Sequence, residues 1–275
     1  MNPDVPEGFE ALRTDGTTLI VAADVHESIL SAGLDSPENW QRHLDQRGSG
    51  AGRGGTARLR LADGTAAVLK QMRRGGALAT LWRDRYPGTR RLLDNLLVPL
   101  EALRRGVPTA RPLAMLLLGG PPGLCRAWAA FQEIENAPDL TVYLGSTDPP
   151  TIEEIDVVTD VVRKMHQEGI EHRDLNLGNL LLRRRPDARS EAFVVDLDRA
   201  RLWEGPVPLR QRIRALCRLE RSSVKLFGER PIAAFDLRRR WYEAYAQDDR
   251  ALAARLDKAR RANHLKLGLH RLGWG

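Results

Sequence analysis

A segment near the middle of the chain combines side chains that suit phosphoryl transfer. It reads His-Arg-Asp-Leu-Asn-Leu-Gly-Asn and places Asp174 five residues before Asn179. A single loop of this kind can hold a carboxylate at an attacking hydroxyl while its other end offers an amide oxygen to Mg²⁺. Asp196 follows in the apolar stretch Val-Val-Asp-Leu-Asp, and a carboxylate leaving a buried strand is the other oxygen ligand that such a site needs. These residues predict a site that binds Mg²⁺ and a phosphate-bearing nucleotide.

A glycine-rich turn and a lysine lie upstream of that segment. Five glycines fall between Gly48 and Gly55, and the backbone N–H groups of such a turn can approach phosphates without a side chain in the way. Lys70 ends the hairpin that this turn opens, so its amine can reach the same phosphates. Each feature alone has an ordinary interpretation as a turn or as a solvated strand end, and the argument for phosphate binding depends on their combination.

The elements that position these residues are strands in the first half and helices in the second. Asp63-Gly64 between two alternating apolar runs predicts a β-hairpin, and Pro99 should kink or split the helix around it. We expect a helix with Ile152, Ile155, Val158, Val162 and Met165 on one face. The predicted strands are 18–22, 56–61, 66–70, 110–118, 125–135, a short strand after Asn179, and 193–201. The predicted helices are 24–32, capped by Asp24, then 89–105, 151–168, 209–227, 231–246 and 248–264.

This order of elements is typical of an α+β protein. The length of 275 residues fits two domains or one enzyme with two lobes. The change from strands to helices places a hinge within residues 132–138. We therefore expect a β-rich N-terminal nucleotide-binding lobe over residues 1–134 and a helical C-terminal catalytic lobe with a basic tail over residues 135–275.

The glycine turn, strand lysine, H-R-D-L-x-x-x-N loop and strand carboxylate occur in the order found in protein kinases. Further segments make the chain resemble the lipopolysaccharide kinase family, whose members phosphorylate 3-deoxy-D-manno-octulosonic acid (Kdo) or heptose in the lipopolysaccharide inner core. The resemblance covers about residues 50–245. Its most specific parts are Arg73-Arg74-Gly75-Gly76 and Asp-Leu-Asp-Arg-Ala-Arg at 196–201, which point to Kdo kinases. The other shared segments are Asp84-Arg85-Tyr86, Thr89-Arg90 and Gly-Val-Pro-Thr-Ala-Arg-Pro at 106–112.

The resemblance implies a two-lobed protein-kinase-like fold and an ATP- and Mg²⁺-dependent kinase acting on an inner-core sugar, most readily Kdo. It implies that Asp174 is the catalytic base or hydroxyl-orienting group, that Asn179 and Asp196 hold Mg²⁺, and that Lys70 engages the α and β phosphates. The residues implied to cover the nucleotide, or to lie beside the adenine through their backbone, are Gly52, Arg53, Gly54, Gly55, Glu133 and Glu135. Asp198 would join the metal site only if the chain turns there, since on a strand its side chain faces the opposite way from Leu197.

One departure from the kinase pattern leaves alternatives open. Kinases pair the strand lysine with a helix glutamate, yet the expected position holds Asp94, and Glu101 is the nearest glutamate. Either residue is a candidate partner of Lys70. A catalytically weak nucleotide-binding scaffold therefore remains an alternative, as does a phosphotransferase acting on another small molecule.

Charge distribution bears on the partners. Residues 210–275 hold 17 basic and 7 acidic residues, a net charge of +10, whereas the preceding 209 residues have a net charge of −3. Such a tail favours an anionic partner, although arginine outnumbers lysine 38 to 5 and genome composition explains that bias equally well. We expect an anionic glycolipid or small sugar acceptor, with peripheral contact to an anionic membrane. Nucleic acid is disfavoured, because no zinc or basic-aromatic module occurs.

The termini and cysteines bear on the compartment. The acidic N-terminus lacks a secretory pattern, and no aliphatic stretch is long enough to span a bilayer. Cys125 and Cys217 stand far apart without a C-x-x-C motif, which disfavours a disulfide framework. We expect a cytoplasmic protein that contacts the inner face of the inner membrane peripherally.

Overall fold

The computed structural model divides the chain into two compact units. Unit 1 comprises residues 1–101 and 110–135, and unit 2 comprises residues 102–109 and 136–275. The structure describes residues 5–14, 16–46, 55–73, 84–120, 123–185, 190–227 and 234–271. None of the described helices combines the length and the apolarity needed to cross a bilayer.

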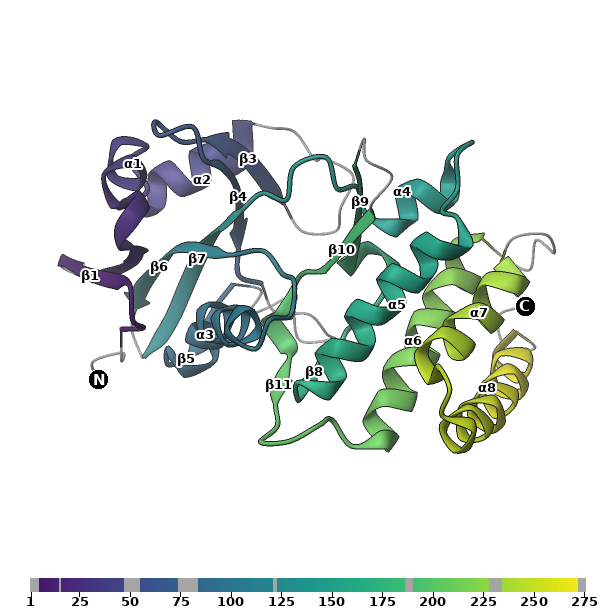
Figure 1. Ribbon diagram of the computed structural model, residues 1–275. Helices are drawn as coiled ribbons and strands as arrows, with labels where there is room; N and C mark the ends of the chain where they lie inside the picture. The colour runs from purple at the N-terminus through teal and green to yellow at the C-terminus, as the bar shows by residue number, and fades with distance from the viewer. Residues whose placement is uncertain are drawn as a thin grey trace. The chain divides into compact units, whose positions relative to one another are not determined.

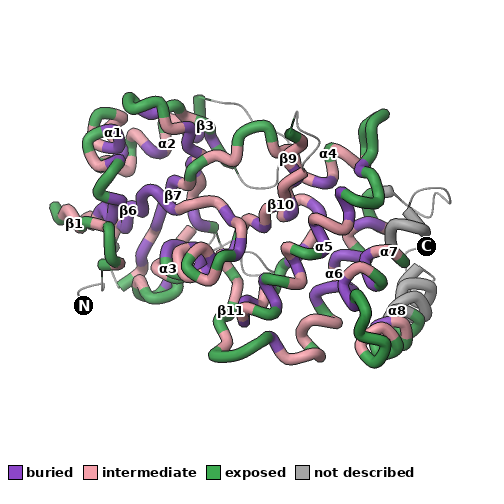
Figure 2. Tube along the Cα trace, in the orientation of Figure 1, coloured by how far each residue is buried: buried purple, intermediate pink, exposed green. Residues whose placement is uncertain are grey.

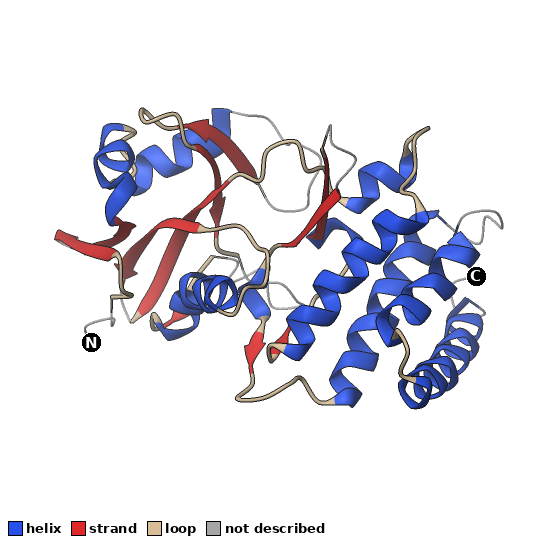
Figure 3. Ribbon diagram, in the orientation of Figure 1, coloured by secondary structure: helices blue, strands red, loops and turns tan. Residues whose placement is uncertain are grey.

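Unit 1 is built on an antiparallel sheet (Figures 1 and 3), with strand order β1-β2-β6-β7-β4-β3 and β5 paired to β7. Its strands are β1 (Phe9–Thr14), β2 (Thr17–Ala22), β3 (Thr56–Arg60), β4 (Ala66–Gln71), β5 (Tyr86–Pro87), β6 (Pro112–Gly120) and β7 (Leu124–Gln132). Its helices are η1 (Ala23–Val25), α1 (His26–Ser31), α2 (Pro37–Gln46) and most of α3 (Arg90–Arg104). The expected hairpin is confirmed: β3 and β4 pair antiparallel, and Gly64 takes a φ of 88° in their turn.

Both faces of this sheet are buried, which explains the unbroken aliphatic run in β6. Leu116 packs with the side chains of α1 and α2, whereas its neighbours Met115 and Leu117 pack with Leu92 and Leu96 of α3. Successive strand residues point to opposite faces, so a strand covered on both sides needs apolar residues at every position. Figure 2 shows the buried tube through β6 and β7 that results.

One expectation for unit 1 is narrowed and another is corrected. Helix α3 runs continuously from Arg90 to Arg104 with Pro99 inside it, so the proline does not split the helix. Asp24 makes no capping hydrogen bond; its carboxylate instead accepts two hydrogen bonds from Arg111, at 2.6 and 2.9 Å. The sequence patterns also missed β1 and α2.

Unit 2 is mainly helical, with two short strand pairs. Its helices are α4 (Leu140–Gly145), α5 (Ile152–Gln167), α6 (Leu209–Phe227), α7 (Ala234–Ala246) and α8 (Arg250–Arg271), with the 3-10 turns η3 (Leu177–Asn179) and η4 (Leu197–Arg199). Strand β9 (Leu180–Arg184) pairs with β10 (Ser190–Val194), and β8 (Ile170–Glu171) pairs with β11 (Arg201–Leu202), both antiparallel. The strand expected over 193–201 is wrong, because β10 ends at Val194 and a turn follows.

Helix α5 is the central helix of unit 2. Four of the five residues expected on its apolar face are fully buried, whereas Ile152, the first residue of the helix, is 60% exposed. The helix begins with a capping box in which Thr151 and Glu154 bond each other's backbone N–H. Glu154 also binds Arg184 of β9, at 2.7 Å, and thereby ties the start of α5 to the β9–β10 pair.

Candidate active site

His172 joins the two segments that carry the expected catalytic and metal-binding residues. The backbone N–H of Asp174 donates to its Nδ1 at 3.2 Å, so Nε2 carries the ring proton and donates to the carbonyl oxygen of Val195 at 3.1 Å. The ring is fully buried, and this burial lowers the pKa of His172 although Asp196 and Asp174 act in the opposite direction. A neutral imidazole therefore holds the loop at Asp174 beside the chain at Asp196.

The backbone of Asp174 is fixed by two amide side chains. Asn176 and Asn179 both donate to its carbonyl oxygen, at 2.8 and 3.1 Å. The carboxylate itself is 57% exposed, and one of its oxygens lies 3.8 Å from a guanidinium nitrogen of Arg218. The structure therefore presents a carboxylate to solvent from a backbone that is held in place, as a residue that orients a hydroxyl requires.

Asn179 and Asp196 lie at the same end of the antiparallel β9–β10 pair, Asn179 directly before β9 and Asp196 two residues after the end of β10. The N–H of Val195 donates to the carbonyl oxygen of Asn179 at 2.9 Å, directly after the β9–β10 pairing. The Asn179 amide nitrogen is bound to Asp174, so its oxygen is the atom that can face a cation. Asp196 is exposed and has left-handed backbone angles, φ 62° and ψ 51°, a conformation that non-glycine residues adopt mainly at turns and functional sites.

The donor set fits Mg²⁺ better than a softer metal. An amide oxygen and carboxylates are the hard ligands that Mg²⁺ takes, usually with several waters. No group of three His, Cys, Asp or Glu residues that could hold a metal occurs in the described part of the chain. Asp198 lies within η4, directly after the turn at Asp196, so the premise that it sits on a strand is wrong. A role for it in the metal site stays a prediction.

The residues expected to bind the nucleotide lie in unit 1. Lys70 is paired with Ala129 of β7 and Thr56 of β3, and its ammonium lies 5.1 Å from the centroid of the Phe131 ring. Gly55 is exposed, and a Cβ there would meet no atom within 4 Å. Gly52, Arg53 and Gly54 lie outside the described residues.

The two glutamates expected beside the adenine bind arginines of β3. Glu133 accepts from Arg58 and Glu135 from Arg60, each at 2.6 Å. Their carboxylates are thus engaged within unit 1, while the Glu133 N–H continues the sheet by donating to Ala66 at 2.8 Å. A contact between the backbone of this segment and a base, as the resemblance implies, stays a prediction.

Asp94 and Glu101, the two candidate partners of Lys70, both lie on α3. Desolvation raises the pKa of Asp94, against the charges of Arg90 and Arg91, which lower it. The choice between Asp94 and Glu101 stays a prediction.

A cavity of about 550 Å³ beside Asp174 was not anticipated from the sequence. Five arginines line it, together with the two carboxylates of Glu171 and Asp174; they are Arg173, Arg199, Arg201, Arg214 and Arg218. Arg214 and Arg218 are four residues apart on α6 and so share one helix face. That spacing was a usable signal, but arginine is so frequent in this tail that it did not stand out.

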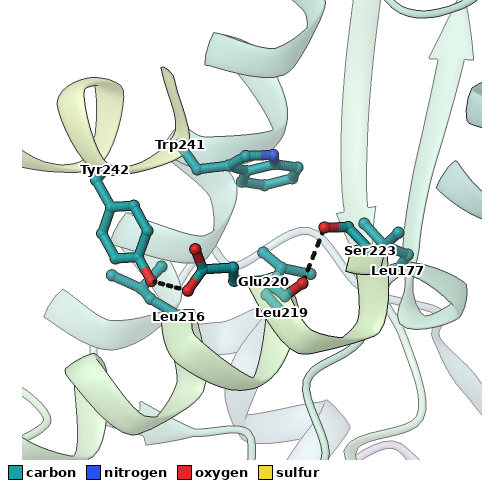
Figure 4. A pocket seen from close by; sticks show the side chains of 7 residues that line it. All are labelled: Leu177, Leu216, Leu219, Glu220, Ser223, Trp241 and Tyr242. Atoms are coloured by element: carbon teal, nitrogen blue, oxygen red, sulfur yellow. Dashed lines mark hydrogen bonds between the residues drawn. The ribbon is translucent and has the colours of Figure 1, made fainter. Parts of the chain in front are cut away.

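The opposite face of α6 is packed and anchored. Figure 4 shows Leu216, Leu219, Glu220 and Ser223 of this helix meeting Trp241 and Tyr242 of α7 and Leu177 of the catalytic loop, around a space of about 10 Å³. The Tyr242 hydroxyl donates to the Glu220 carboxylate at 3.1 Å, and burial raises the pKa of Tyr242. In addition, the Leu177 N–H donates to Ser222 at 3.3 Å. These contacts fix α6, and with it the arginines on its other face, relative to the catalytic loop.

Several known proteins resemble this chain. The model of the lipopolysaccharide kinase (Kdo/WaaP) family matches residues 37–245. A 3-deoxy-D-manno-octulosonic acid kinase of Xylella fastidiosa (strain M12) is 33% identical over 221 residues, which cover 77% of this chain and 84% of that protein. The protein of the same name from Xanthomonas campestris pv. campestris (strain B100) is 33% identical over 209 residues, covering 72% and 77%.

Among solved structures, WaaP in complex with acyl carrier protein matches with a TM-score of 0.52 and 20% sequence identity, over 85% of this chain and 95% of that one. This likeness shows a shared kinase-like fold and no more. The family match spans the loop from His172 to Asn179, the turn at Asp196 and all of helix α6. The chain belongs to the lipopolysaccharide kinase (Kdo/WaaP) family.

Proposed function

We propose that the protein transfers the γ-phosphoryl group of ATP to a hydroxyl of a lipopolysaccharide inner-core sugar, with Kdo as the acceptor. The observation that carries this proposal is the junction at His172, where one buried neutral ring binds the backbone on both sides of the site. This ring bonds the loop that carries the solvent-facing carboxylate of Asp174 and the chain directly before Asp196, which supports a shared site. The names of the curated relatives support Kdo as the acceptor.

In this proposal each side chain has one task. Asp174 accepts the proton of the acceptor hydroxyl while the oxygen of that hydroxyl bonds to the γ-phosphorus. The bond between this phosphorus and the oxygen that bridges it to the β-phosphate breaks, and ADP leaves. Asn179 and Asp196 hold Mg²⁺, which neutralises charge on the phosphates when bound. Catalysis then depends on positioning and electrostatics, without a covalent enzyme intermediate.

In the same proposal, unit 1 supplies the nucleotide contacts. Residues 1–134 serve as the nucleotide-binding lobe, and residues 135–275 serve as the catalytic lobe. Lys70 binds the α and β phosphates, and the turn from Gly52 to Gly55 covers them. The segment from Glu133 to Glu135 lies beside the adenine through its backbone, because its carboxylates are bound to arginines. The acceptor would be met at the cytoplasmic face of the inner membrane, with the basic C-terminal helices contacting anionic lipid.

The test is acceptor phosphorylation by the purified chain with radiolabelled ATP. Asp174→Ala should abolish turnover while leaving the thermal unfolding temperature unchanged, because its carboxylate is exposed. Asp196→Ala should remove Mg²⁺-dependent ATP binding. Asp160→Ala is the matched control, since Asp160 is an exposed carboxylate of unit 2 that, among the described residues, pairs only with its helix neighbour Arg163 and with Gln247. Undiminished phosphorylation by the Asp174→Ala protein would rule out the proposal.

An acceptor screen distinguishes the two rivals. Phosphorylation of an aminoglycoside but not of Kdo would favour a different small-molecule phosphotransferase. ATP binding without turnover on any acceptor would favour a scaffold.

A further inference from the structure

The cavity next to Asp174 carries more positive charge than its own acidic residues neutralise. Five arginines and two carboxylates line it, and His172 is neutral, so the formal net charge of the lining is +3. Like charges gathered around one hollow repel one another, and although Arg199, Arg201 and Arg214 are exposed to solvent, a bound anion would relieve that repulsion. The positive charge of this cavity therefore favours an anionic ligand.

Two of the five arginines are matched within the cavity by a carboxylate. Arg173 lies 3.8 Å from Glu171, and Arg218 lies 3.8 Å from Asp174. A third, Arg201, stacks its guanidinium 4.1 Å from the centroid of the Trp203 ring, and the indole of that tryptophan donates to Glu171 at 3.1 Å. The stacking leaves the N–H edge of the guanidinium available to a ligand.

Arg199 and Arg214 have neither an ion-pair nor a hydrogen-bond partner within the described ranges of the chain. They come from different segments, Arg199 from η4 and Arg214 from the anchored helix α6. The surplus positive charge is thus contributed by two walls of the cavity. One anionic group near Arg214 and a second near Arg199 and Arg201 would match it.

We infer that this cavity is the acceptor site and that it recognises an acceptor bearing at least two anionic groups, carboxylate or phosphate. The inference rests on the proposed function and deepens it, because a single acidic sugar neutralises one of three surplus charges. Arg199, Arg201 and Arg214 bind the anionic groups, and guanidinium groups suit both carboxylate and phosphate oxygens. Arg218, whose guanidinium lies 3.8 Å from Asp174, guides the reacting sugar toward the catalytic carboxylate.

The experiment compares acceptors that differ in the number of anionic groups. The full chain is assayed with ATP and three probes: the methyl ester of the Kdo methyl glycoside, the Kdo methyl glycoside itself, and a Kdo disaccharide. These carry no, one and two carboxylates. The wild-type KM should fall at each step, by about tenfold per added anion, as expected when a charge-assisted hydrogen bond is gained. Equal KM values for the glycoside and the disaccharide would overturn the inference.

Variants locate the effect in the cavity. Arg214→Gln and Arg199→Gln should each raise the KM for the disaccharide about tenfold, should leave the KM for the singly charged glycoside closer to its wild-type value, and should not change the KM for ATP. Arg210→Gln is the matched control: it removes the same charge from α6 at an exposed position outside the cavity. An increase in the KM for ATP would overturn the inference, because the cavity would then serve the nucleotide.

A measurement without turnover separates this inference from the proposed function. The disaccharide is titrated calorimetrically into Asp174→Asn protein, with and without Arg214→Gln. Binding that disappears with Arg214→Gln supports the anionic site even if no acceptor is phosphorylated. Turnover that requires Asp174 but ignores both arginine substitutions would retain the proposed function and reject the two-anion site.

Discussion

Gly169 is a position where one methyl group should disturb both stability and the catalytic loop. It follows α5 with a φ of 76°, a left-handed conformation that glycine adopts freely and that costs an L-residue about 1–2 kcal/mol. A Cβ there would lie 2.5 Å from the carbonyl oxygen of Gly205 and 2.7 Å from that of Trp203. Both atoms are backbone, so neither can rotate away.

The expected cost of Gly169→Ala has two parts. To the conformational part we add about 1–3 kcal/mol for inserting a methyl group where no space exists, which gives a destabilisation of about 2–5 kcal/mol. The strain should also reach the site, because the Trp203 N–H donates to Gly169 at 2.8 Å and β8 then leads directly into His172. Acceptor phosphorylation should therefore fall as well.

Urea unfolding followed by tryptophan fluorescence measures the effect, with Gly205→Ala as the control. Gly205 is exposed, and a Cβ there would meet nothing within 4 Å, so its substitution should change stability by no more than about 0.5 kcal/mol. Gly169→Asn separates the two parts, since asparagine tolerates left-handed angles but keeps the clash. If the free energies of unfolding of the Gly169→Ala and Gly205→Ala proteins differ by less than about 0.5 kcal/mol, the reasoning from the crowded carbonyls is refuted.

Three further predictions concern buried polar groups of unit 2. Burial lowers the pKa of His166 to about 3. Between pH 6.5 and pH 3 the unfolded chain therefore binds a proton at this histidine that the folded chain does not. The free energy of unfolding should fall with falling pH by up to about 1.4 kcal/mol per pH unit. His166→Gln should flatten that slope in urea titrations from pH 7 to 5, and an unchanged slope would contradict the assignment. Tyr242→Phe removes the donor to the buried Glu220 carboxylate and should cost about 1–3 kcal/mol in the same assay; a variant as stable as wild type would show that the bond is not formed. His172→Ala leaves the Val195 carbonyl and the Asp174 N–H without their partner. It should lower kcat by a larger factor than it changes the KM for ATP. A variant that loses stability but keeps the wild-type kcat would reject the positioning role of His172.

Much of the fold could be predicted from local patterns. The Asp63-Gly64 hairpin and helix α6 follow from turn chemistry and helical spacing, and each is found at or within a residue or two of the expected bounds. Strand β1 was missed because it is an edge strand, paired only with β2 and partly exposed along its length, so its apolar alternation is weak. Helix α2 was missed because only Trp40 and Leu44 of its ten residues are buried.

The site was harder to predict where tertiary contacts decide the local structure. The apolar residues before Asp196 suggested one continuous strand, yet the chain enters a left-handed turn there that no pattern of apolar residues announces. Likewise, Asp24 looked like a helix cap, but its partner is Arg111, 87 residues away. The candidate catalytic residues could be proposed from the sequence because their spacing within one loop is short, whereas the arginine cavity draws on three segments that only the folded chain brings together.

The short stretch 102–109 has a practical consequence for dissecting this protein. It groups with unit 2 although the chain on either side of it belongs to unit 1. Within unit 2, Arg105 donates to the carbonyl oxygens of Glu168 and Trp203, and the Pro108 carbonyl accepts from Val194 at the end of β10. A fragment that begins at residue 136 would lose these hydrogen bonds, which lie on both sides of the loop from His172 to Asn179 in the sequence. To be studied in isolation, the C-terminal half therefore needs residues 102–109, fused to it or added as a peptide.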